Sequence, residues 1–383
     1  MPRGAGYVIL ALVTVLAVVG VYREFTSRQA ALAEDAGKLM FPEFRDVINN
    51  TASIAVQNAE GDFTLVRKAG TWVLKERASY PAHHARVNEM LVGLTQIKLI
   101  EKKTKKPERY AKLGLADPGS EDSDAQRYTV LDAAGKVLAD LILGERKAAR
   151  GEPNMNEIYV RRPGDPQTWN ALAGLPNIVD TVDWLREELT RFDDLRVREV
   201  AVTHGDDPVV TVFRAAGVGQ GYDLANVPEG REVDNYFIVR NVASTLVNLD
   251  LDDVRADEGS ALEGAQPHTF TLRTFDGLEL TMETVKVDDD RLVRLSAKAI
   301  EPVAAPAAFD ESDRKEDKVV IKTADEVAAE IERLNRQWQG YLFSLADWRI
   351  APSYKPLAEL LKAPEEEGTT PSGAEAGGNI SGG

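Results

Sequence analysis

The four histidines are the first residues to consider for catalysis or metal binding, because the chain contains no cysteine. His83 and His84 are adjacent, so their rings point in different directions on a helix or a strand. A zinc site needs further histidine or acidic ligands, and none stands three or four residues away. We therefore expect this pair at a solvated helix start. His204 and His268 stand beside strand-like segments, and the chain lacks the G-x-S-x-G pattern of a serine nucleophile.

The glycine and aspartate clusters fit cofactor or calcium sites poorly. Gly217–Gly221 (GVGQG) is superficially similar to a dinucleotide-binding loop, but it precedes a short strand and not a phosphate-binding helix, so a hairpin is favoured. Asp250–Asp253 and Asp288–Asp290 lack the EF-hand pattern of a central Gly and a terminal Glu, and we interpret them as a helix exit and a turn. The acids from Asp310 to Asp317 are expected in a solvated loop. The sequence therefore predicts no catalytic residue, no metal ligand and no cofactor.

The charge balance bears on possible partners. Acidic residues outnumber basic ones by 62 to 46 among 383 residues, a formal net charge of −16. Nucleic-acid binding needs a basic surface, so we expect no nucleic-acid partner. One segment, Lys102–Arg109, is basic and is followed by Glu121, Asp122 and Asp124. Two interpretations remain open: a charged loop balanced by those acids, or a surface that touches anionic lipid head groups.

The elements that would position any site begin with an apolar segment, Gly4–Tyr22, that carries no charge. As a helix it would span about 28 Å, close to the thickness of the hydrocarbon core. We expect an uncleaved membrane anchor in residues 1–28; the alternative is a cleaved signal peptide. Arg3 and the amino terminus before the segment nearly balance Arg23 and Arg28 after it under the positive-inside rule. We expect the N-terminus inside and the remainder outside the cytoplasm.

The middle of the chain repeats. The first unit, residues 41–180, opens with Phe41-Pro42-Glu43-Phe44-Arg45, and the second, residues 192–362, opens with Phe192-Asp193-Asp194-Leu195-Arg196. Residues 363–383 are acidic and rich in glycine, and they are expected to form a disordered tail. The boundary between the units should fall near Thr181–Arg191.

Each opener is followed by strands of alternating polarity, one amphipathic helix and further strands. The helices are expected at Ala85–Ile97 and Val233–Leu249, and a capping box at Thr323-x-x-Glu326 predicts another. The predicted fold class is α+β: an N-terminal transmembrane helix and two repeated units of mostly antiparallel sheet with packed helices. The expected core includes Trp72, Leu91, Leu94, Leu141, Val210, Leu246, Phe270 and Leu280.

Several motifs of the first unit resemble a bacterial family that carries the domain of unknown function 4340. The similar stretches are Phe41-Pro42, Gly70–Leu74 (GTWVL), Tyr110–Pro118 (YAKLGLADP), Asp140–Glu145 (DLILGE) and Ile158–Arg161 (IYVR). The second unit lacks the counterparts of the third and fourth stretches. The resemblance implies a membrane-tethered extracytoplasmic, periplasmic protein, whose genes often lie beside those of ABC transporters of the gliding-motility type.

Two classes of function follow. We expect no enzyme, but a membrane-anchored extracytoplasmic binding or scaffolding protein of the bacterial inner membrane, crossing it once. The resemblance implies an ABC transporter permease or auxiliary subunit as its partner. The alternative is a cell-envelope hydrolase whose site is built from dispersed carboxylates brought together by folding.

Overall fold

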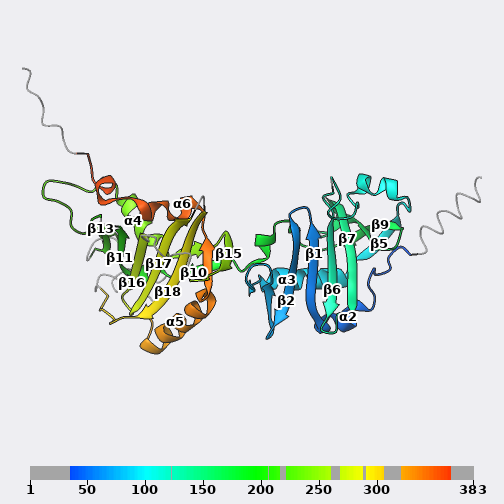
Figure 1. Ribbon diagram of the computed structural model, residues 1–383, viewed down its shortest axis with the longest axis horizontal. Helices are drawn as coiled ribbons and strands as arrows, with labels where there is room; N and C mark the ends of the chain where they lie inside the picture. The colour runs from blue at the N-terminus through cyan, green and yellow to red at the C-terminus, as the bar shows by residue number, and fades with distance from the viewer. Residues whose placement is uncertain are drawn as a thin grey trace, which may run out of the picture. The chain divides into compact units, whose positions relative to one another are not determined.

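The computed structural model describes residues 35–121, 123–205, 207–215, 221–259, 268–287, 290–305 and 321–363. The expected anchor, Gly4–Tyr22, and residues 364–383 of the expected tail lie outside these ranges. The chain divides into two compact units (Figure 1). The first ends at Glu187 and the second begins at Glu188, except that the short segment Asp252–Ala256 clusters with the first.

The first unit is built on a nine-stranded antiparallel sheet with the order β4-β3-β2-β1-β6-β7-β8-β9-β5. Its strands are β1 (Thr51–Asn58), β2 (Gly61–Lys68), β3 (Thr71–Leu74), β4 (Tyr80–Pro81), β5 (Lys98–Lys102), β6 (Gln126–Asp132), β7 (Val137–Ala148), β8 (Asn156–Arg161) and β9 (Thr168–Ala173). Its helices are α2 (Phe44–Val47) and α3 (His84–Thr95), with short 3-10 helices at Ile48–Asn50, Pro107–Arg109, Ala111–Leu113 and Thr181–Trp184.

The second unit is built on an eight-stranded sheet with the order β13-β12-β11-β16-β17-β18-β19-β15, and it has a separate β10-β14 pair. The edge strand β15 is the segment that clusters with the first unit. Its strands are β10 (Glu188–Arg191), β11 (Val197–His204), β12 (Val210–Arg214), β13 (Tyr222–Leu224), β14 (Asn248–Asp250), β15 (Asp253–Ala256), β16 (His268–Thr274), β17 (Leu278–Val287), β18 (Asp290–Ala299) and β19 (Tyr341–Ser344). Its helices are α4 (Tyr236–Ser244), α5 (Ala324–Trp338) and α6 (Asp347–Ile350), with 3-10 helices at Asp194–Arg196, Ala351–Tyr354 and Leu357–Leu360.

The two sheets share one strand order. The series β3-β2-β1-β6-β7-β8-β9-β5 corresponds strand for strand to β13-β12-β11-β16-β17-β18-β19-β15. The register shifts at the same place in both units, between Thr51 and Ser53 in β1 and between Val197 and Glu199 in β11. A helix follows the opening strands in each, α3 in the first and α4 in the second. The second unit also carries α5 between β18 and β19, where the first has only a loop.

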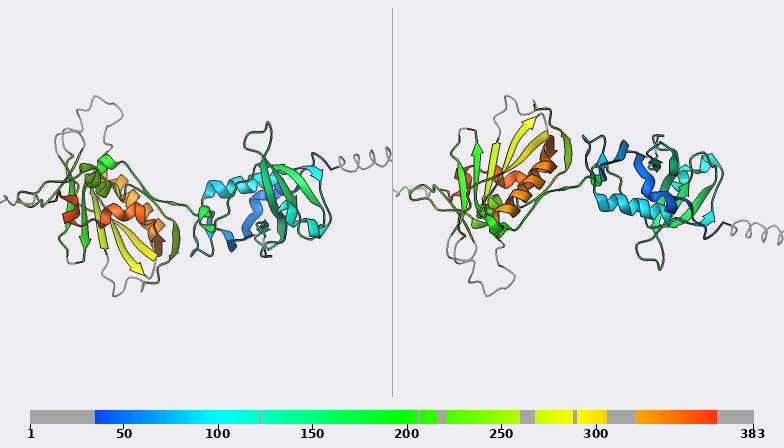
Figure 2. Two further views of the ribbon diagram at one scale, coloured as in Figure 1. Left: turned by 90° about the horizontal axis from the view of Figure 1, so that it is seen from above. Right: turned by 90° about the horizontal axis from the view of Figure 1, so that it is seen from below.

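The predicted α+β class with an N-terminal transmembrane helix is wrong for the described part of the chain. The two large sheets dominate it, and its longest helix, α5, has only 15 residues. No helix among the described residues is both long enough and apolar enough to cross a membrane. The physical reason is that apolar residues recur mainly at every second position, which favours strands. Figure 2 shows α3 lying against the first sheet and α5 against the second.

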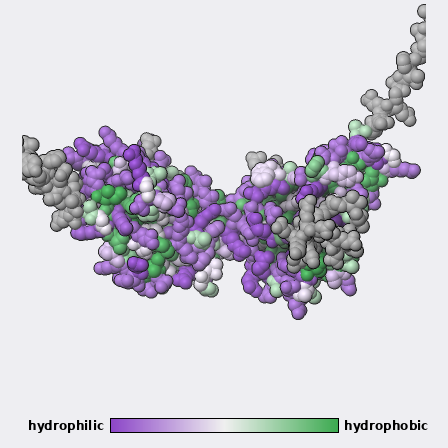
Figure 3. All heavy atoms as spheres, turned by 180° about the vertical axis from the view of Figure 1, so that it is seen from behind, coloured by the Kyte–Doolittle hydropathy of each residue, from purple (hydrophilic) through white to green (hydrophobic). Residues whose placement is uncertain are grey.

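The residues predicted to lie in the hydrophobic core of the two units are buried. All eight residues expected there are buried, the most exposed being Leu91 at 6%. The capping box of α5 is also confirmed, since the Thr323 side chain accepts from the Glu326 N–H and the Glu326 carboxylate accepts from Thr323. Figure 3 shows hydrophilic side chains over most of the visible face of each unit, with small apolar patches between them. The sheets therefore direct their apolar positions inward.

A buried ion-pair network ties α5 to the second sheet. The Arg196 guanidinium lies 2.7 Å from Asp276 and 2.8 Å from Glu330, and all three side chains are nearly inaccessible to water. Lys322 adds a fourth charge, 2.9 Å from Glu330. The charges hold the pKa of both carboxyls below the ordinary value although burial opposes this. Removing the arginine would leave two buried carboxylates without their main partner.

Candidate functional site

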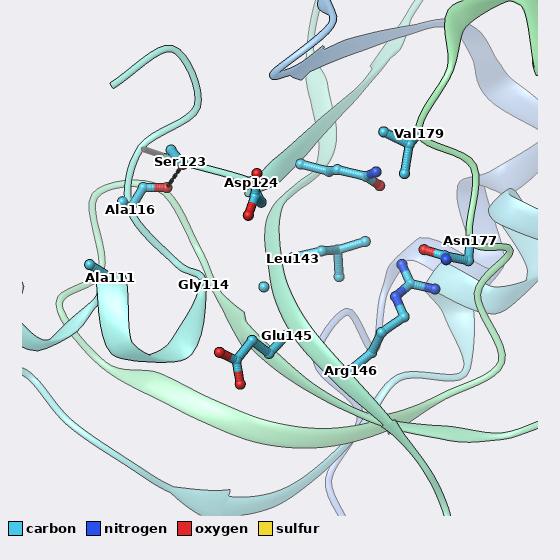
Figure 4. Close-up of a pocket in the computed structure, with 12 residues that line it drawn as sticks. Ala111, Gly114, Ala116, Ser123, Asp124, Leu143, Glu145, Arg146, Asn177 and Val179 are labelled. Atoms are coloured by element: carbon cyan, nitrogen blue, oxygen red, sulfur yellow. Dashed lines mark hydrogen bonds between the residues drawn. The ribbon is translucent and has the colours of Figure 1, made fainter. Parts of the chain in front are cut away.

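A polar pocket of about 240 Å³ lies in the first unit (Figure 4). Four segments form its wall: the 3-10 helix Ala111–Leu113 with the loop after it, the beginning of β6, the second half of β7, and the loop that follows β9. The polar side chains that line it are Ser123, Asp124, Gln126, Glu145, Arg146 and Asn177. Two of the motifs noted in the sequence, Tyr110–Pro118 and Asp140–Glu145, therefore meet at one pocket.

A single buried arginine of β8, Arg161, holds the first of these segments in place. Its Nε donates to the Leu115 carbonyl at 3.0 Å, its guanidinium lies 4.8 Å from the Tyr110 ring centroid, and it also pairs with Asp117. The Tyr110 hydroxyl donates to the Pro166 carbonyl at 2.7 Å. These contacts fix the loop on the sheet before any ligand binds, which lowers the ordering cost of binding.

Two glycines let this loop approach β7. Gly114 has φ +64°, the left-handed conformation that favours glycine, and a Cβ there would lie 2.9 Å from the Glu145 backbone nitrogen. A Cβ on Gly144 would overlap the Leu113 carbonyl oxygen. Both motif glycines are therefore explained by backbone packing beside the pocket.

Arg146 provides the cationic part of the pocket. The register of β7 against β8 shifts between Leu143 and Arg146, and such a bulge re-aims the side chains that follow it. The guanidinium Nη1 donates to the Leu175 and Pro176 carbonyls at 3.3 and 3.4 Å. No carboxylate of the described residues forms an ion pair with Arg146, and burial lowers its pKa. A partly buried guanidinium of this kind suits a carboxylate or carbonyl group of a ligand.

Two carboxylates, Asp124 and Glu145, line the same pocket as this arginine. In Figure 4 Arg146 and Asn177 lie on one side, the Ala111–Gly114 segment lies on the other, and Asp124 lies between them. The fold thus places two carboxylates that are 21 residues apart in the sequence on the lining of one pocket. The same arrangement also suits a ligand with both acceptor and donor groups.

The first histidine pair lies at a helix start, as expected. His83 is the N-cap of α3, and its Nδ1 accepts from the Arg86 N–H at 3.4 Å. His84 is exposed, and its Nε2 lies 2.9 Å from the Asn88 side-chain nitrogen. Both rings therefore have local roles at the beginning of the helix.

The second pair forms a cluster that the sequence did not predict. His204 and His268 are cross-strand partners on β11 and β16, and Thr284 of β17 pairs with His268. The two imidazole centroids lie 4.1 Å apart, and the Tyr354 ring stacks on His268 at 4.1 Å. The Arg291 guanidinium lies over the tyrosine ring, 4.2 Å from its centroid. The sequence gives no sign of this cluster, because it depends on the register of three neighbouring strands, β11, β16 and β17.

The acidic cluster at Asp250–Asp253 forms ion pairs and a connection between strands. Asp250 pairs with Arg191 at 3.5 Å and with Arg349 at 3.3 Å. The predicted helix exit at Asp250–Asp253 is wrong, because these residues connect strands β14 and β15. Within the described ranges no three His, Asp or Glu side chains are grouped as a metal ion would need. Gly217–Gln220, Asp288–Asp289 and Asp310–Asp317 lie outside the described residues.

The family comparison bears directly on the pocket. The family described as domain of unknown function (DUF4340) matches residues 72–272, which is 201 of the 383 residues. The chain belongs to this family. The matched range contains both motifs that meet at the pocket, together with Arg146 and Asn177. No curated protein and no solved structure matches the chain.

Sequence reasoning found part of this site. The family motifs indicated the loop at Tyr110–Pro118 and the strand end at Gly144-Glu145, but as structural signatures only. It missed Arg146 and Asn177, because a bulge in β7 and the path of the chain after β9 decide where they point. The sequence feature that could have indicated Arg146 is its position directly after the Leu143-Gly144-Glu145 motif.

Proposed function

We propose that this chain is a non-enzymatic, membrane-anchored extracytoplasmic binding or scaffolding protein whose first unit holds a partner at the pocket around Arg146. The observation that supports this best is the meeting of two family motifs at one polar pocket. Its volume of about 240 Å³ is below the range of about 300–1,000 Å³ typical of sites for drug-sized ligands. Because that volume holds little more than one side chain or chain end, we favour the end of a peptide segment of a partner protein as the occupant.

The chemistry of the lining agrees with a peptide. Arg146 and Asn177 offer donors to backbone carbonyls or a terminal carboxylate, while Asp124 and Glu145 offer acceptors to N–H groups. The Gln126 amide is already committed, donating to Ile178 at 3.1 Å and accepting from the Tyr128 hydroxyl at 2.9 Å. It therefore supports the wall, as does Ser123, whose hydroxyl donates to the Ala116 carbonyl at 3.2 Å. Recognition is left to the four side chains named above.

The proposed location is the bacterial inner membrane, with both units outside the cytoplasm. The charge-free segment Gly4–Tyr22 supports attachment to the membrane. Confinement to the membrane plane would raise the effective concentration of any membrane-embedded partner. The partner we propose is an ABC transporter permease or auxiliary subunit, on the basis of the family resemblance. A C-terminal alkaline phosphatase fusion should be active, and an inactive fusion with an active cytoplasmic reporter would contradict this placement.

Affinity purification in mild detergent, followed by mass spectrometry of the recovered proteins, tests the proposal. Arg146→Gln should lower partner recovery by about 10- to 100-fold, since a hydrogen bond to a charged group is worth about 1.5–3 kcal/mol. Arg150→Gln is the matched control, because Arg150 is exposed and lies outside the pocket. Equal recovery of the same partner by both variants would overturn the proposed role of the pocket.

The hydrolase alternative is tested with the same purified protein. Turnover of cell-envelope oligosaccharides that is lost in both Asp124→Asn and Glu145→Gln would replace the binding proposal with an enzyme. Retained partner recovery without turnover supports the binding proposal. Deleting residues 364–383 should leave the complex intact, whereas replacing Gly4–Tyr22 with a cleavable signal should weaken it.

A further inference from the structure

One edge of the first unit carries a concentration of positive charge that the pocket does not use. Residues 102–112, which we call the basic edge, contain six basic side chains and one acidic one. Their net charge of +5 contrasts with −16 for the whole chain. Such a local reversal of charge indicates an anionic partner, provided that the cations are exposed and not already neutralised.

The basic edge is fixed to the sheet at its start. The Lys103 N–H donates to the Thr168 carbonyl, and Thr104 and Thr168 exchange further bonds, all at 2.9 Å. The ammonium of Lys102 lies 5.3 Å from the Trp169 ring centroid. The segment therefore presents its charges from a defined position on β5 and β9.

Four of the cations point into solvent: Lys105, Lys106, Arg109 and Lys112 are exposed. None of them forms an ion pair with another described residue, whereas Lys103 pairs with Glu101 at 2.5 Å. Glu121 and Asp124, two of the acids that could balance the segment, make no ion pair with it either. The interpretation as a loop neutralised by these acids therefore lacks the contacts that it needs.

The chain enters the first unit along this same edge. Asp35, the first described residue, lies 2.7 Å from Lys102, and the Gly37 N–H donates to the Leu99 carbonyl of β5 at 2.7 Å. Twelve residues separate Tyr22 from Asp35. Even fully extended, they reach at most about 45 Å. A chain held at the membrane by Gly4–Tyr22 therefore keeps the basic edge close to the lipid surface.

We propose that the basic edge binds anionic lipid head groups and so orients the first unit on the membrane. This inference rests on the proposed membrane attachment. Each lysine or arginine near an anionic membrane strengthens binding by about fivefold, so three charge reversals should weaken contact by at least about 100-fold. Salt screens exposed charges beyond roughly 10 Å at 0.1 M, so contact should also weaken at high ionic strength.

The experiment uses the full chain in nanodiscs of phosphatidylcholine, with or without phosphatidylglycerol. Because the natural chain has no cysteine, Pro107→Cys, at an exposed residue outside the pocket, places a single fluorophore within the basic edge. A nitroxide-labelled head-group lipid should quench this fluorophore strongly only in discs with phosphatidylglycerol, and less at high salt. Ala134→Cys, in the turn between β6 and β7, is the control for labelling position.

The decisive comparison is between two triple variants. Lys105→Glu/Lys106→Glu/Arg109→Glu should abolish the quenching, whereas Lys75→Glu/Lys136→Glu/Arg150→Glu, also at exposed residues, should not change it. Quenching that is independent of lipid charge, or equal in both variants, overturns the inference. If the chain does not insert into discs at all, membrane attachment has failed. The same labelled chain is then floated with vesicles, and binding only to anionic vesicles, lost in the first triple variant, still supports the basic edge.

Discussion

Acidification should destabilise the second unit, because a buried neutral imidazole must then take up a proton. Burial, together with the neighbouring His204 and Arg291, lowers the pKa of His268 from 6.5 to about 4, and a hydrogen bond with the Ser353 backbone acts in the opposite direction. The stacked Tyr354 ring covers the imidazole, and Arg291 pairs with Asp347 at 3.3 Å.

The direction and the size of the stability change follow from the difference between the native and unfolded pKa of His268. The unfolded chain binds the proton near pH 6.5 and the native chain only near pH 4, so this contribution to stability is complete above pH 6.5 and is lost as the pH falls toward 4. A difference of about 2.5 pH units, at about 1.4 kcal/mol per unit, sets an upper limit of about 3.5 kcal/mol. The imidazole keeps some exposure to solvent, which screens part of this, so we expect a loss of about 2 kcal/mol.

The assay is urea unfolding of the full chain between pH 7 and pH 4, with amide hydrogen exchange of β16 peptides as the local probe and β6 peptides of the first unit as the internal control. His268→Gln should be less stable than the natural chain at pH 7 but should lose most of the pH dependence in β16. An unchanged pH dependence in His268→Gln would refute the assignment to this imidazole.

Three further substitutions, one of them with a control, test the packing of the two units. Arg196→Met should cost about 3–5 kcal/mol of unfolding free energy, measured by urea unfolding, because two buried carboxylates lose their main partner. In the same assay the control Arg198→Met should cost less than about 1 kcal/mol, because Arg198 belongs to a partly exposed ion pair. Leu141→Ala should cost about 2–5 kcal/mol in the same assay, and a loss near zero would mean that the face assigned to β7 is wrong. Gly144→Ala should cost about 1–3 kcal/mol through the clash with Leu113, and faster hydrogen exchange at 110–118 would locate the damage.

The strands were predictable where burial follows a period of two. In β16 every second residue from His268 to Thr274 is buried, and the expected core residue Phe270 lies on that face. The helices were less predictable, because tertiary contacts end them. The second expected helix, Val233–Leu249, ends at Ser244, and Thr190 then accepts from the Leu249 N–H and donates to the Leu246 carbonyl as β10 pairs with β14.

The candidate site was only partly predictable for a similar reason. The glycines of the family motifs marked the loop and the strand end, because backbone packing requires glycine at 114 and 144. The position of Arg146 depends on a register shift between β7 and β8, and that of Asn177 on the return of the chain after β9. Neither is encoded in a local pattern, so only the folded chain brings them together.

The most direct test of the central claim is photo-crosslinking in cells from a side chain at the pocket. A photoreactive amino acid at Val179, which lines the pocket, should give a crosslink to one membrane protein, and Arg146→Gln in the same chain should remove it. The same amino acid at Val137, an exposed position on β7 outside the pocket, should give no such product. Identical crosslinks from both positions, or a crosslink at Val179 that survives Arg146→Gln, would contradict the account.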